Sequence, residues 1–282
     1  MLDFLTHLEL ERGLARNTLE AYRGDLAQFG AFLADRGRDV LAVAPDELAA
    51  FVAELANGRA GKTLAAATLK RKAACLRSFY GHLHRSAMIE RNPASALTGP
   101  RLTKRRPESL SRGEIDQLLA QPRGTSPAAL RDRALLELLS ACGIRASEAI
   151  ALEQGDLDLD TGVLRVDANG ARERLVSVPR SALAAIRAYL HGGRPLLVGP
   201  REQQRMFVNW RGATLTRQGI YKIVERHART AGLAEQVNPR TLRHACATHL
   251  LASGCEISSL QAILGHADIA TTQLYTDLAS AA

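Results

Sequence analysis

The sequence has few aromatic residues and few cysteines. Phe, Trp and Tyr make up 4% of the 282 residues, whereas alanine is abundant, and this composition favours helices. The four cysteines, at positions 75, 142, 246 and 255, show no CxxC spacing. Their spacing argues against a disulfide framework and a cysteine-based zinc site, and it fits a reducing cytoplasm best.

Long apolar runs are also missing. No stretch approaches the roughly 18 uncharged apolar residues that a membrane-spanning helix needs. The first residues, MLDFLTHLELERG, carry acids within their apolar run and show no small-residue cleavage site. We therefore expect a cytoplasmic protein that neither spans a membrane nor is exported.

Acidic residues are almost absent between Arg59 and Arg106. This segment of 48 residues holds twelve Lys or Arg and one acid, Glu90, which gives a net charge of +11. Because the whole chain carries +8, the remainder is slightly acidic at −3. A concentrated positive charge predicts a polyanionic partner such as nucleic acid, and a solvated helix face is the alternative at this stage.

Apolar periodicity predicts helices through most of the N-terminal part of the chain. The pattern covers residues 1–57 and resumes over about 64–84, where basic residues occupy the polar face. Helical periodicity stops over residues 97–110, LTGPRLTKRRPESL, which combine Gly and Pro with four basic residues. We interpret these features as a helical domain over residues 1–96, followed by a basic linker over 97–110.

The rest of the chain, residues 111–282, is predicted to be a second and mostly helical domain. The residues SRGE that open it have the spacing of a capping box, which restarts a helix. A long apolar helix follows over about 128–141 and ends at Gly143. The exception is VLRVDANGARERLVSV, in which two β-rich runs flank Asn169-Gly170, a strong signal for a tight hairpin.

Three side chains near the end of the sequence form a set suited to attack on a phosphodiester. Tyr275 follows His266 by nine residues, and Arg243 precedes that histidine by 23. A tyrosine oxygen can attack phosphorus when arginines hold the other phosphate oxygens and a neutral imidazole adds a hydrogen bond. Arg145, which follows the helix-ending Gly143 and precedes a new helix, is a second candidate phosphate ligand.

Four segments resemble the tyrosine recombinase (phage integrase) family: ACGIRASEAIAL, the hairpin, PRTLRHACATHLLASG and LQAILGHADIATTQLYT. Their order and spacing are most similar to the Xer branch, and the resemblance covers almost the whole chain, including ARNTLEAYRGDLAQF near the start. It implies a mainly α protein that clamps duplex DNA. The implied parts are an N-terminal helical (SAM-like) core-binding domain and a mostly helical catalytic domain with a small β-sheet.

The resemblance assigns roles to the four residues. Tyr275 would be the nucleophile that joins the chain to DNA through a 3′-phosphotyrosyl bond, with Arg145 and Arg243 binding the phosphate and His266 donating a supporting hydrogen bond. The phosphotyrosine conserves the energy of the phosphodiester, so no cofactor is expected. The implied activity is site-specific recombination of double-stranded DNA by a homo- or hetero-tetramer. The implied role is resolution of chromosome or plasmid dimers, with a division-linked DNA translocase as a further partner.

The basic segment supplies the expected contacts to the DNA backbone. Contacts of this kind fix position on the duplex and do not read its sequence, so the target site is not readable from the chain. The residues predicted to bind DNA are Lys70, Arg71, Lys72, Arg77, Lys104, Arg105 and Arg106.

Two positions depart from the family pattern. Arg240 stands where the family has a histidine that assists deprotonation of the tyrosine, and arginine does not titrate near neutral pH. Asn169 stands where a lysine protonates the departing 5′ oxygen. Loss of a positioned acid or base typically costs about 10²–10⁴ in rate. We expect His244 and His249 to be poor substitutes, because a spacing of five residues puts them on different sides of a helix.

A third departure concerns assembly. Seven residues follow Tyr275, whereas Xer relatives continue into a helix that docks on a neighbouring protomer. The resemblance therefore leaves the mode of assembly open.

Several functions remain open at this stage. The first is an active recombinase of the Xer type. The two substitutions favour, as an alternative, a DNA-binding relative without cleavage or an inactive partner subunit. A topoisomerase-like enzyme that uses the same tyrosine is a third function. A purely structural helical protein would leave the basic segment unexplained.

Overall fold

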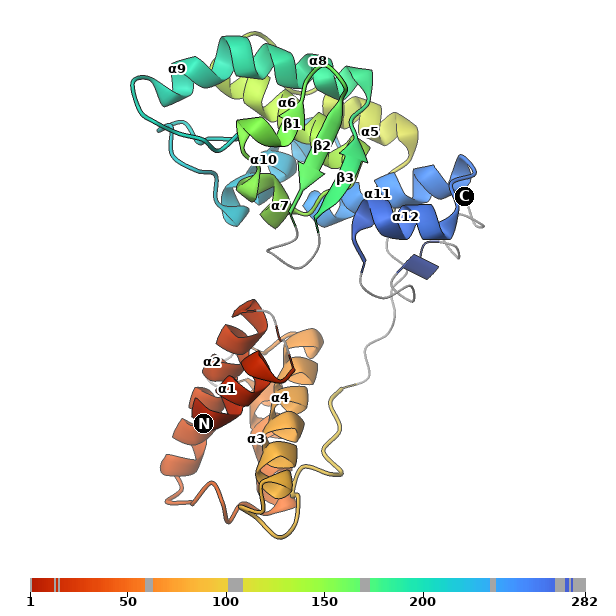
Figure 1. The fold of residues 1–282 in the computed structure, drawn as a ribbon. Helices are drawn as coiled ribbons and strands as arrows, with labels where there is room; N and C mark the ends of the chain where they lie inside the picture. Colours follow the sequence, from red (N-terminus) through yellow and green to blue (C-terminus); the bar gives the residue numbers. More distant parts are fainter. Residues whose placement is uncertain are drawn as a thin grey trace. The chain divides into compact units, whose positions relative to one another are not determined.

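The structure divides into two units with separate cores. This computed structural model describes residues 2–12, 14, 16–58, 63–100, 109–167, 173–233, 237–266, 272–273 and 275. The two units are residues 1–105 and 106–282 (Figure 1). Most of the linker predicted over residues 97–110 lies outside the described residues.

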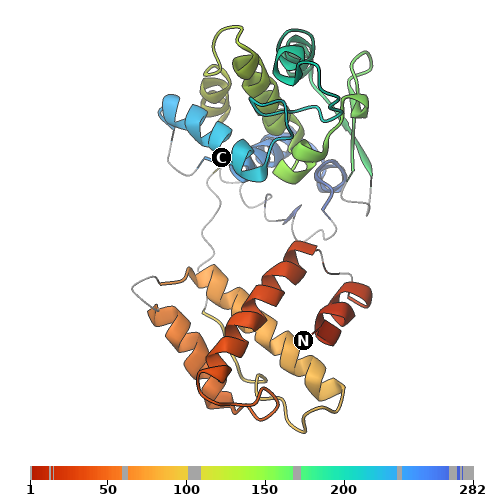
Figure 2. The same cartoon turned by 90° about the vertical axis from the view of Figure 1, so that its left-hand side faces the viewer.

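The first unit is a helical bundle (Figure 2). Aromatic rings form much of its core. Phe29 is 1% exposed, and its ring meets those of Phe51 and Tyr80 edge to face, with centroids 5.0 and 6.2 Å away. Such pairs add stability beyond the area that they bury. The longest helix, α4, packs against α2 and α3. The helices of this unit are α1 (Leu2–Leu10), α2 (Arg16–Ala34), α3 (Pro45–Asn57) and α4 (Ala66–Arg85).

The second unit is organised around one buried helix, α6. Ser126 caps its start by accepting from the Ala129 N–H, and Gly143 ends it with a left-handed φ of 57°. The helix packs against α8 and α11. The helical elements of the described part are α5 (Arg112–Leu119), α6 (Pro127–Cys142), α7 (Ala146–Ala151), η2 (Gln154–Asp156), α8 (Arg180–Ala188), η3 (Tyr189–Gly193), α9 (Arg194–Val198), α10 (Arg217–Thr230), α11 (Pro239–Ala252) and α12 (Ile257–Leu264).

A small antiparallel sheet with the strand order β1-β2-β3 completes the second unit. Its strands are β1 (Leu157–Asp158), β2 (Val163–Val166) and β3 (Arg174–Ser177). Leu164 pairs with Val176, and both side chains are buried in the core. The two β-rich runs predicted from the sequence are therefore confirmed as β2 and β3. Their connecting turn, with Asn169-Gly170, lies outside the described residues.

The fold class predicted from the sequence is confirmed: mainly α, with an N-terminal helical domain and a small sheet. The predicted capping box is present as well. Ser111 Oγ accepts from the Glu114 N–H at 3.3 Å, and Glu114 Oε2 accepts from the Ser111 N–H at 2.8 Å. Across the part of the chain that the structure describes, no helix is long and apolar enough to cross a membrane.

Candidate active site

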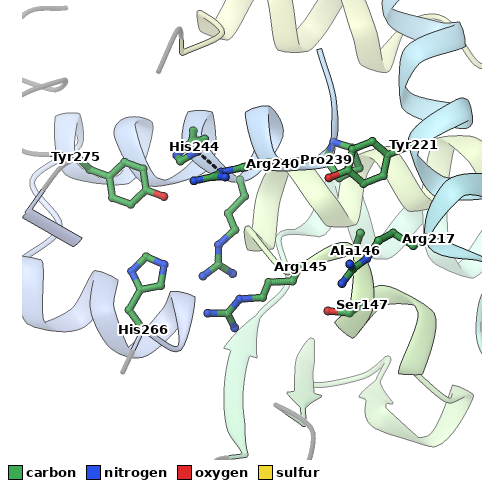
Figure 3. A pocket seen from close by; sticks show the side chains of 11 residues that line it. Arg145, Ala146, Ser147, Arg217, Tyr221, Pro239, Arg240, His244, His266 and Tyr275 are labelled. Atoms are coloured by element: carbon green, nitrogen blue, oxygen red, sulfur yellow. Dashed lines mark hydrogen bonds between the residues drawn. The ribbon is translucent and has the colours of Figure 1, made fainter. Parts of the chain in front are cut away.

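One pocket in the second unit contains all four residues predicted to carry the chemistry. Its volume is about 460 Å³, and it is lined by Arg145, Arg243, His266 and Tyr275 together. These residues come from the start of α7, from α11 and from the chain after α12. Figure 3 shows Arg145, His266 and Tyr275 pointing into the same space. The other lining residues are Ala146, Ser147, Arg217, Tyr221, Pro239, Arg240 and His244.

Arg243 is anchored between the ends of two helices. Its Nη1 donates to the Gly143 carbonyl after α6, and its Nη2 donates to the Leu264 carbonyl at the end of α12, both at 2.7 Å. The free carbonyls at helix C-termini carry partial negative charge and suit a cation. Burial, and then repulsion from Arg145, lower the pKa of Arg243 to about 10. The guanidinium is therefore still charged at neutral pH.

Arg145 is held at the start of α7 by Glu148. Its Nη1 donates to Glu148 Oε1 at 2.8 Å, its backbone N–H donates to Glu148 Oε2 at 2.7 Å, and its Nη2 donates to the Gly265 carbonyl at 3.0 Å. The Glu148 carboxylate thus occupies the Arg145 backbone N–H, one of the helix-start donors that were expected to bind an anion. The arginine side chain, 39% exposed, remains the part that faces the pocket.

The same carboxylate binds a second arginine, Arg174 of β3. Both Nη atoms of Arg174 donate to Glu148 at 2.9 Å, and its Nε donates to the Ile263 carbonyl at 2.7 Å. Burial alone would raise the pKa of Glu148, but hydrogen bonds from Arg174 and the Arg145 backbone outweigh it, and the pKa is lowered. Sequence reasoning missed this pairing, because Glu148 read only as part of a helix start.

We predict that Glu148→Gln lowers the free energy of unfolding by about 3 kcal/mol at pH 7, because it removes the negative charge that pairs with the buried Arg174. A carboxylate with a lowered folded pKa stabilises above its unfolded pKa, and this contribution disappears as the pH falls through the folded value. The difference from the parent chain should therefore shrink in acid. Urea denaturation at pH 7 and at pH 4 measures it. Glu225→Gln, which removes an exposed carboxylate paired with Arg229, is the control and should cost under about 0.5 kcal/mol; equal losses in both variants would contradict the prediction.

His266 and Tyr275 lie face to face. Their rings are 12° from parallel with centroids 6.2 Å apart, and His266 Nδ1 hydrogen-bonds with Thr272 Oγ1 at 2.9 Å. Burial, followed by repulsion from Arg243, lowers the pKa of His266 to about 4, so the imidazole is neutral at pH 7. Tyr275 is 4% exposed, and burial raises the pKa of its phenol against the opposing effect of Arg243 and Arg240.

His244 also belongs to the pocket, one helical turn after Arg240. The Arg240 Nε–H donates to His244 Nε2 at 3.2 Å, and the centroids of the His244 and Tyr275 rings are 5.3 Å apart. Burial, and then Arg240 and Arg243, lower the pKa of His244 to about 4. His249, five residues on, lines a different hollow beside Arg112. Sequence reasoning gave His244 no role in the site; its spacing of four residues from Arg240 was the available signal.

The first turns of α10 supply the far side of the pocket. Arg217 and Tyr221 line it together with Ser147 of α7, and Figure 3 shows them beyond Arg145. Tyr221 is 40% exposed, which leaves it accessible to a ligand. The sequence analysis assigned no role to Arg217 or Tyr221, because neither belongs to the motifs that carry the resemblance. Asn169 lies outside the described residues, so its position at the pocket stays a prediction.

The predicted DNA-binding residues of α4 differ in exposure. Lys70 and Arg77 are exposed, and Arg77 Nη1 donates to the Leu97 carbonyl at 2.8 Å. Arg71 is half-buried and paired with Asp25. Lys104, Arg105 and Arg106 lie outside the described residues.

For Lys72 the prediction of a surface contact is wrong. It is 7% exposed, and its Nζ donates to Asp25 Oδ1 and to Gln28 Oε1, both at 2.6 Å. A buried carboxylate needs a cation, and Lys72 meets that need inside the first unit. Periodicity placed Lys72 among the basic residues of the helix without showing that Asp25 faces it.

We predict opposite outcomes for Lys70 and Lys72. Lys70→Met should weaken DNA binding and reduce the slope of log affinity against log salt by about 1, with little change in stability. Lys72→Met should lower the free energy of unfolding by about 2 kcal/mol, because the buried carboxylate of Asp25 loses its bond to the ammonium, and should leave the slope unchanged. Urea denaturation and binding titrations over a range of salt test both. A smaller salt slope in Lys72→Met would contradict the structural role.

Among the described residues, no group of three or more His, Cys, Asp or Glu is arranged to hold a metal ion. The pocket instead gathers guanidinium groups, neutral imidazoles and the phenols of Tyr221 and Tyr275, a set that fits a phosphate group with a nucleophile beside it.

Comparison with known proteins agrees with this chemistry. Residues 108–281 match the Phage integrase family, and residues 2–86 match the Phage integrase N-terminal SAM-like domain. The chain is 39% identical over 279 residues to the tyrosine recombinase XerD of Pseudomonas aeruginosa, covering 99% of this chain and 92% of that protein. It is 38% identical over 281 residues to the tyrosine recombinase XerC of Pelotomaculum thermopropionicum, covering 97% and 92%.

Solved structures share the fold. The XerH site-specific recombinase bound to palindromic difH substrate, in a post-cleavage complex, matches with a TM-score of 0.79 at 22% identity, over 96% of this chain and 79% of that one. The XerA recombinase matches with a TM-score of 0.56 at 26% identity, over 97% and 91%. Matches to both domains and near full-length identity to XerD and XerC show that the chain belongs to the phage integrase family, as a tyrosine recombinase of the Xer branch.

Proposed function

We propose that this chain cuts and rejoins duplex DNA with Tyr275 as the nucleophile. Site-specific recombination is the activity of its family, and the proposal extends that activity to named residues of this pocket. The observation that carries it is the meeting of Arg145, Arg243, His266 and Tyr275 in one cavity of about 460 Å³. Each residue supplies a different part of phosphoryl transfer.

The two arginines bind the phosphate. A guanidinium has five N–H donors, and Arg243 engages two of its nitrogens with carbonyls, so donors remain for phosphate oxygens. Those carbonyls and Glu148 also fix both guanidinium groups before DNA arrives, which avoids ordering them during the reaction. Neutral His266 can donate one further hydrogen bond to the same phosphate.

The reaction exchanges one ester for another. The Tyr275 oxygen attacks phosphorus, the bond from phosphorus to the 5′ oxygen breaks, and a 3′-phosphotyrosyl link and a free 5′ hydroxyl result. A 5′ hydroxyl from another strand then attacks the phosphotyrosine, restores the DNA backbone and releases the phenol. Both steps conserve one phosphate ester, so no external energy source is needed.

The substrate that we propose is a double-stranded recombination site held by four protomers, either identical or paired with a related recombinase. The identity of 38–39% to XerD and XerC over nearly the whole chain supports a role in resolving chromosome or plasmid dimers. A division-linked DNA translocase is the further partner that this role implies.

A second function is a DNA-binding relative that does not cleave. It is favoured by Arg240, which lines the pocket where the family pattern has a proton-accepting histidine, and by Asn169 in place of a lysine. Such a protein would bind its site with the same phosphate ligands and serve as an inactive subunit.

Covalent trapping separates the two functions. The chain first selects a binding site from a pool of random duplexes, and that site is then built as a nicked duplex from which the cleaved end diffuses away. Incubation with EDTA should give a protein–DNA adduct on a denaturing gel. A retarded native complex without adduct, in which Arg240→His combined with Asn169→Lys restores the adduct, would support the second function instead.

A further inference from the structure

Arg240 and His244 form a hydrogen-bonded pair on the face of α11 that borders the pocket. The Arg240 Nε–H donates to His244 Nε2 at 3.2 Å, and both side chains line the same cavity as Tyr275. In Figure 3 a dashed line marks this bond, and the Tyr275 hydroxyl is directed toward the guanidinium end of Arg240. The permanent positive charge of Arg240 opposes the effect of burial and lowers the pKa of the Tyr275 phenol.

Among the described residues, the charges around Tyr275 at neutral pH are those of arginines. The described titratable and charged groups that face it are Arg145, Arg240, Arg243, His244, His266 and Cys246. Burial lowers the pKa of both histidines to about 4, so they are neutral. Burial also raises the pKa of the Cys246 thiol to about 12, so it keeps its proton. The two histidines and Cys246 therefore add no charge near the phenol at neutral pH, and the arginines carry the charge there.

The His244 ring accepts a hydrogen bond from Arg240 through its Nε2 atom. Because its Nε2 accepts from Arg240, the proton of the neutral ring lies on Nδ1. Within the described residues, Nδ1 is buried and has no hydrogen-bond partner. Leaving the buried Nδ1–H without an acceptor costs about 1–3 kcal/mol. The ring nevertheless takes the orientation in which Nε2 accepts from Arg240. With this geometry His244 can hold the Arg240 guanidinium, whereas its Nε2 is not free to accept a proton from Tyr275.

We propose that His244 is a positioning residue that holds the Arg240 guanidinium against the Tyr275 hydroxyl, so that a fixed positive charge activates the nucleophile in place of a proton-accepting histidine. This inference rests on the proposed strand-cleaving function. Arginine at position 240 is then an adaptation of the site, and His244 is the residue that makes it work.

The step balances without a protein base. The phenolic proton passes to hydroxide from the solvent, which forms water and leaves a phenolate beside Arg240. The phenolate electron pair forms the bond from oxygen to phosphorus, and the bond from phosphorus to the 5′ oxygen breaks. The departing 5′ oxygen takes a proton from solvent water, which regenerates the hydroxide.

The first test follows the ionisation of Tyr275 without DNA. Fluorotyrosine is incorporated into the chain, the Tyr275 fluorine signal is identified by its loss in Tyr275→Phe, and its pH titration is recorded. Arg240→Met should raise the pKa of Tyr275 by about one unit, as for loss of an opposite charge within roughly 4–6 Å. His244→Leu should raise it in the same direction. His244→Gln, which keeps an acceptor for Arg240, should restore most of the parent value.

The control for this titration is Arg229→Met, which removes an arginine whose side chain is 80% exposed and which does not line the pocket. It should leave the fluorine titration unchanged. A titration of Tyr275 that is the same in the parent and in Arg240→Met would overturn the role of Arg240. Equal shifts in His244→Leu and His244→Gln would overturn the positioning role of His244.

The second test measures cleavage against pH. A nicked duplex with sulfur in place of the bridging 5′ oxygen is used, because a thiolate leaves without needing a proton. The logarithm of the parent rate should rise by about one per pH unit from pH 6 to 9, as for phenol ionisation to solvent. Arg240→His should bend the profile near pH 6.5, the ordinary imidazole pKa. A bend in the parent that His244→Gln removes would make His244 the proton acceptor and overturn the proposal.

Failure of the proposed function and failure of the Arg240–His244 pair would give different results. Absence of an adduct in every variant, even with the sulfur substrate, would contradict the proposed function. The fluorine titration would still show whether Arg240 and His244 act on Tyr275. An adduct that forms equally fast in the parent, Arg240→Met and His244→Leu would confirm cleavage and contradict the pair.

Discussion

Replacing Arg243 with alanine is expected to abolish detectable strand cleavage. Removal of one preorganised donor to a developing oxyanion typically costs about 10²–10³ in rate, and Arg243 offers a charged fork in a buried site. The same change leaves the Gly143 and Leu264 carbonyls without their donor, so the free energy of unfolding should fall by about 2–4 kcal/mol. Adduct formation and urea denaturation measure the two effects.

Arg243→Lys separates the two contributions. An ammonium keeps the charge but loses the planar fork, so cleavage should stay at least about tenfold below the parent even where the variant is folded. Arg229→Ala, on the exposed face of α10, is the matched control for loss of one positive charge. Parent-like cleavage by folded Arg243→Lys would show that charge alone suffices and that the fork is not used.

Replacing Tyr275 with phenylalanine should eliminate the covalent adduct and leave DNA affinity within about twofold, because it removes one oxygen from a ring that stays packed against His244 and His266. Denaturing gels and equilibrium binding measure the two properties. Tyr22→Phe, in the first unit, is the control. Persistence of the adduct in Tyr275→Phe, or its loss in Tyr221→Phe instead, would place the nucleophile elsewhere in the pocket.

Much of the fold and the membership of the site was predictable from local sequence patterns. The capping box at Ser111 and the helix end at Gly143 depend on a few neighbouring residues, and both are present in the structure. Arg145, Arg243, His266 and Tyr275 carry motifs with fixed spacing, and the structure brings them into one pocket. Their roles in catalysis stay predictions.

What escaped prediction depends on contacts between distant segments. Glu148 and Arg174 are 26 residues apart, and Asp25 and Lys72 are 47 apart, so no periodic pattern joins either pair. From the sequence, Lys72 was predicted to be a surface charge. In the fold it is buried and pairs with the buried Asp25. Long-range ion pairs of this kind decide which basic residues are left for DNA.

The most direct test of the central proposal is to find the atom that carries the DNA. Residues 244–282 contain no Lys or Arg and a single tyrosine, so trypsin releases Tyr275 on a peptide with no competing phenol. An adduct formed on the selected duplex is digested with trypsin and nuclease and examined by mass spectrometry. We predict a nucleotide joined through its 3′ phosphate to Tyr275. DNA attached to another residue or through a 5′ phosphate, or a chain that binds its site and never carries DNA, would contradict the proposed function.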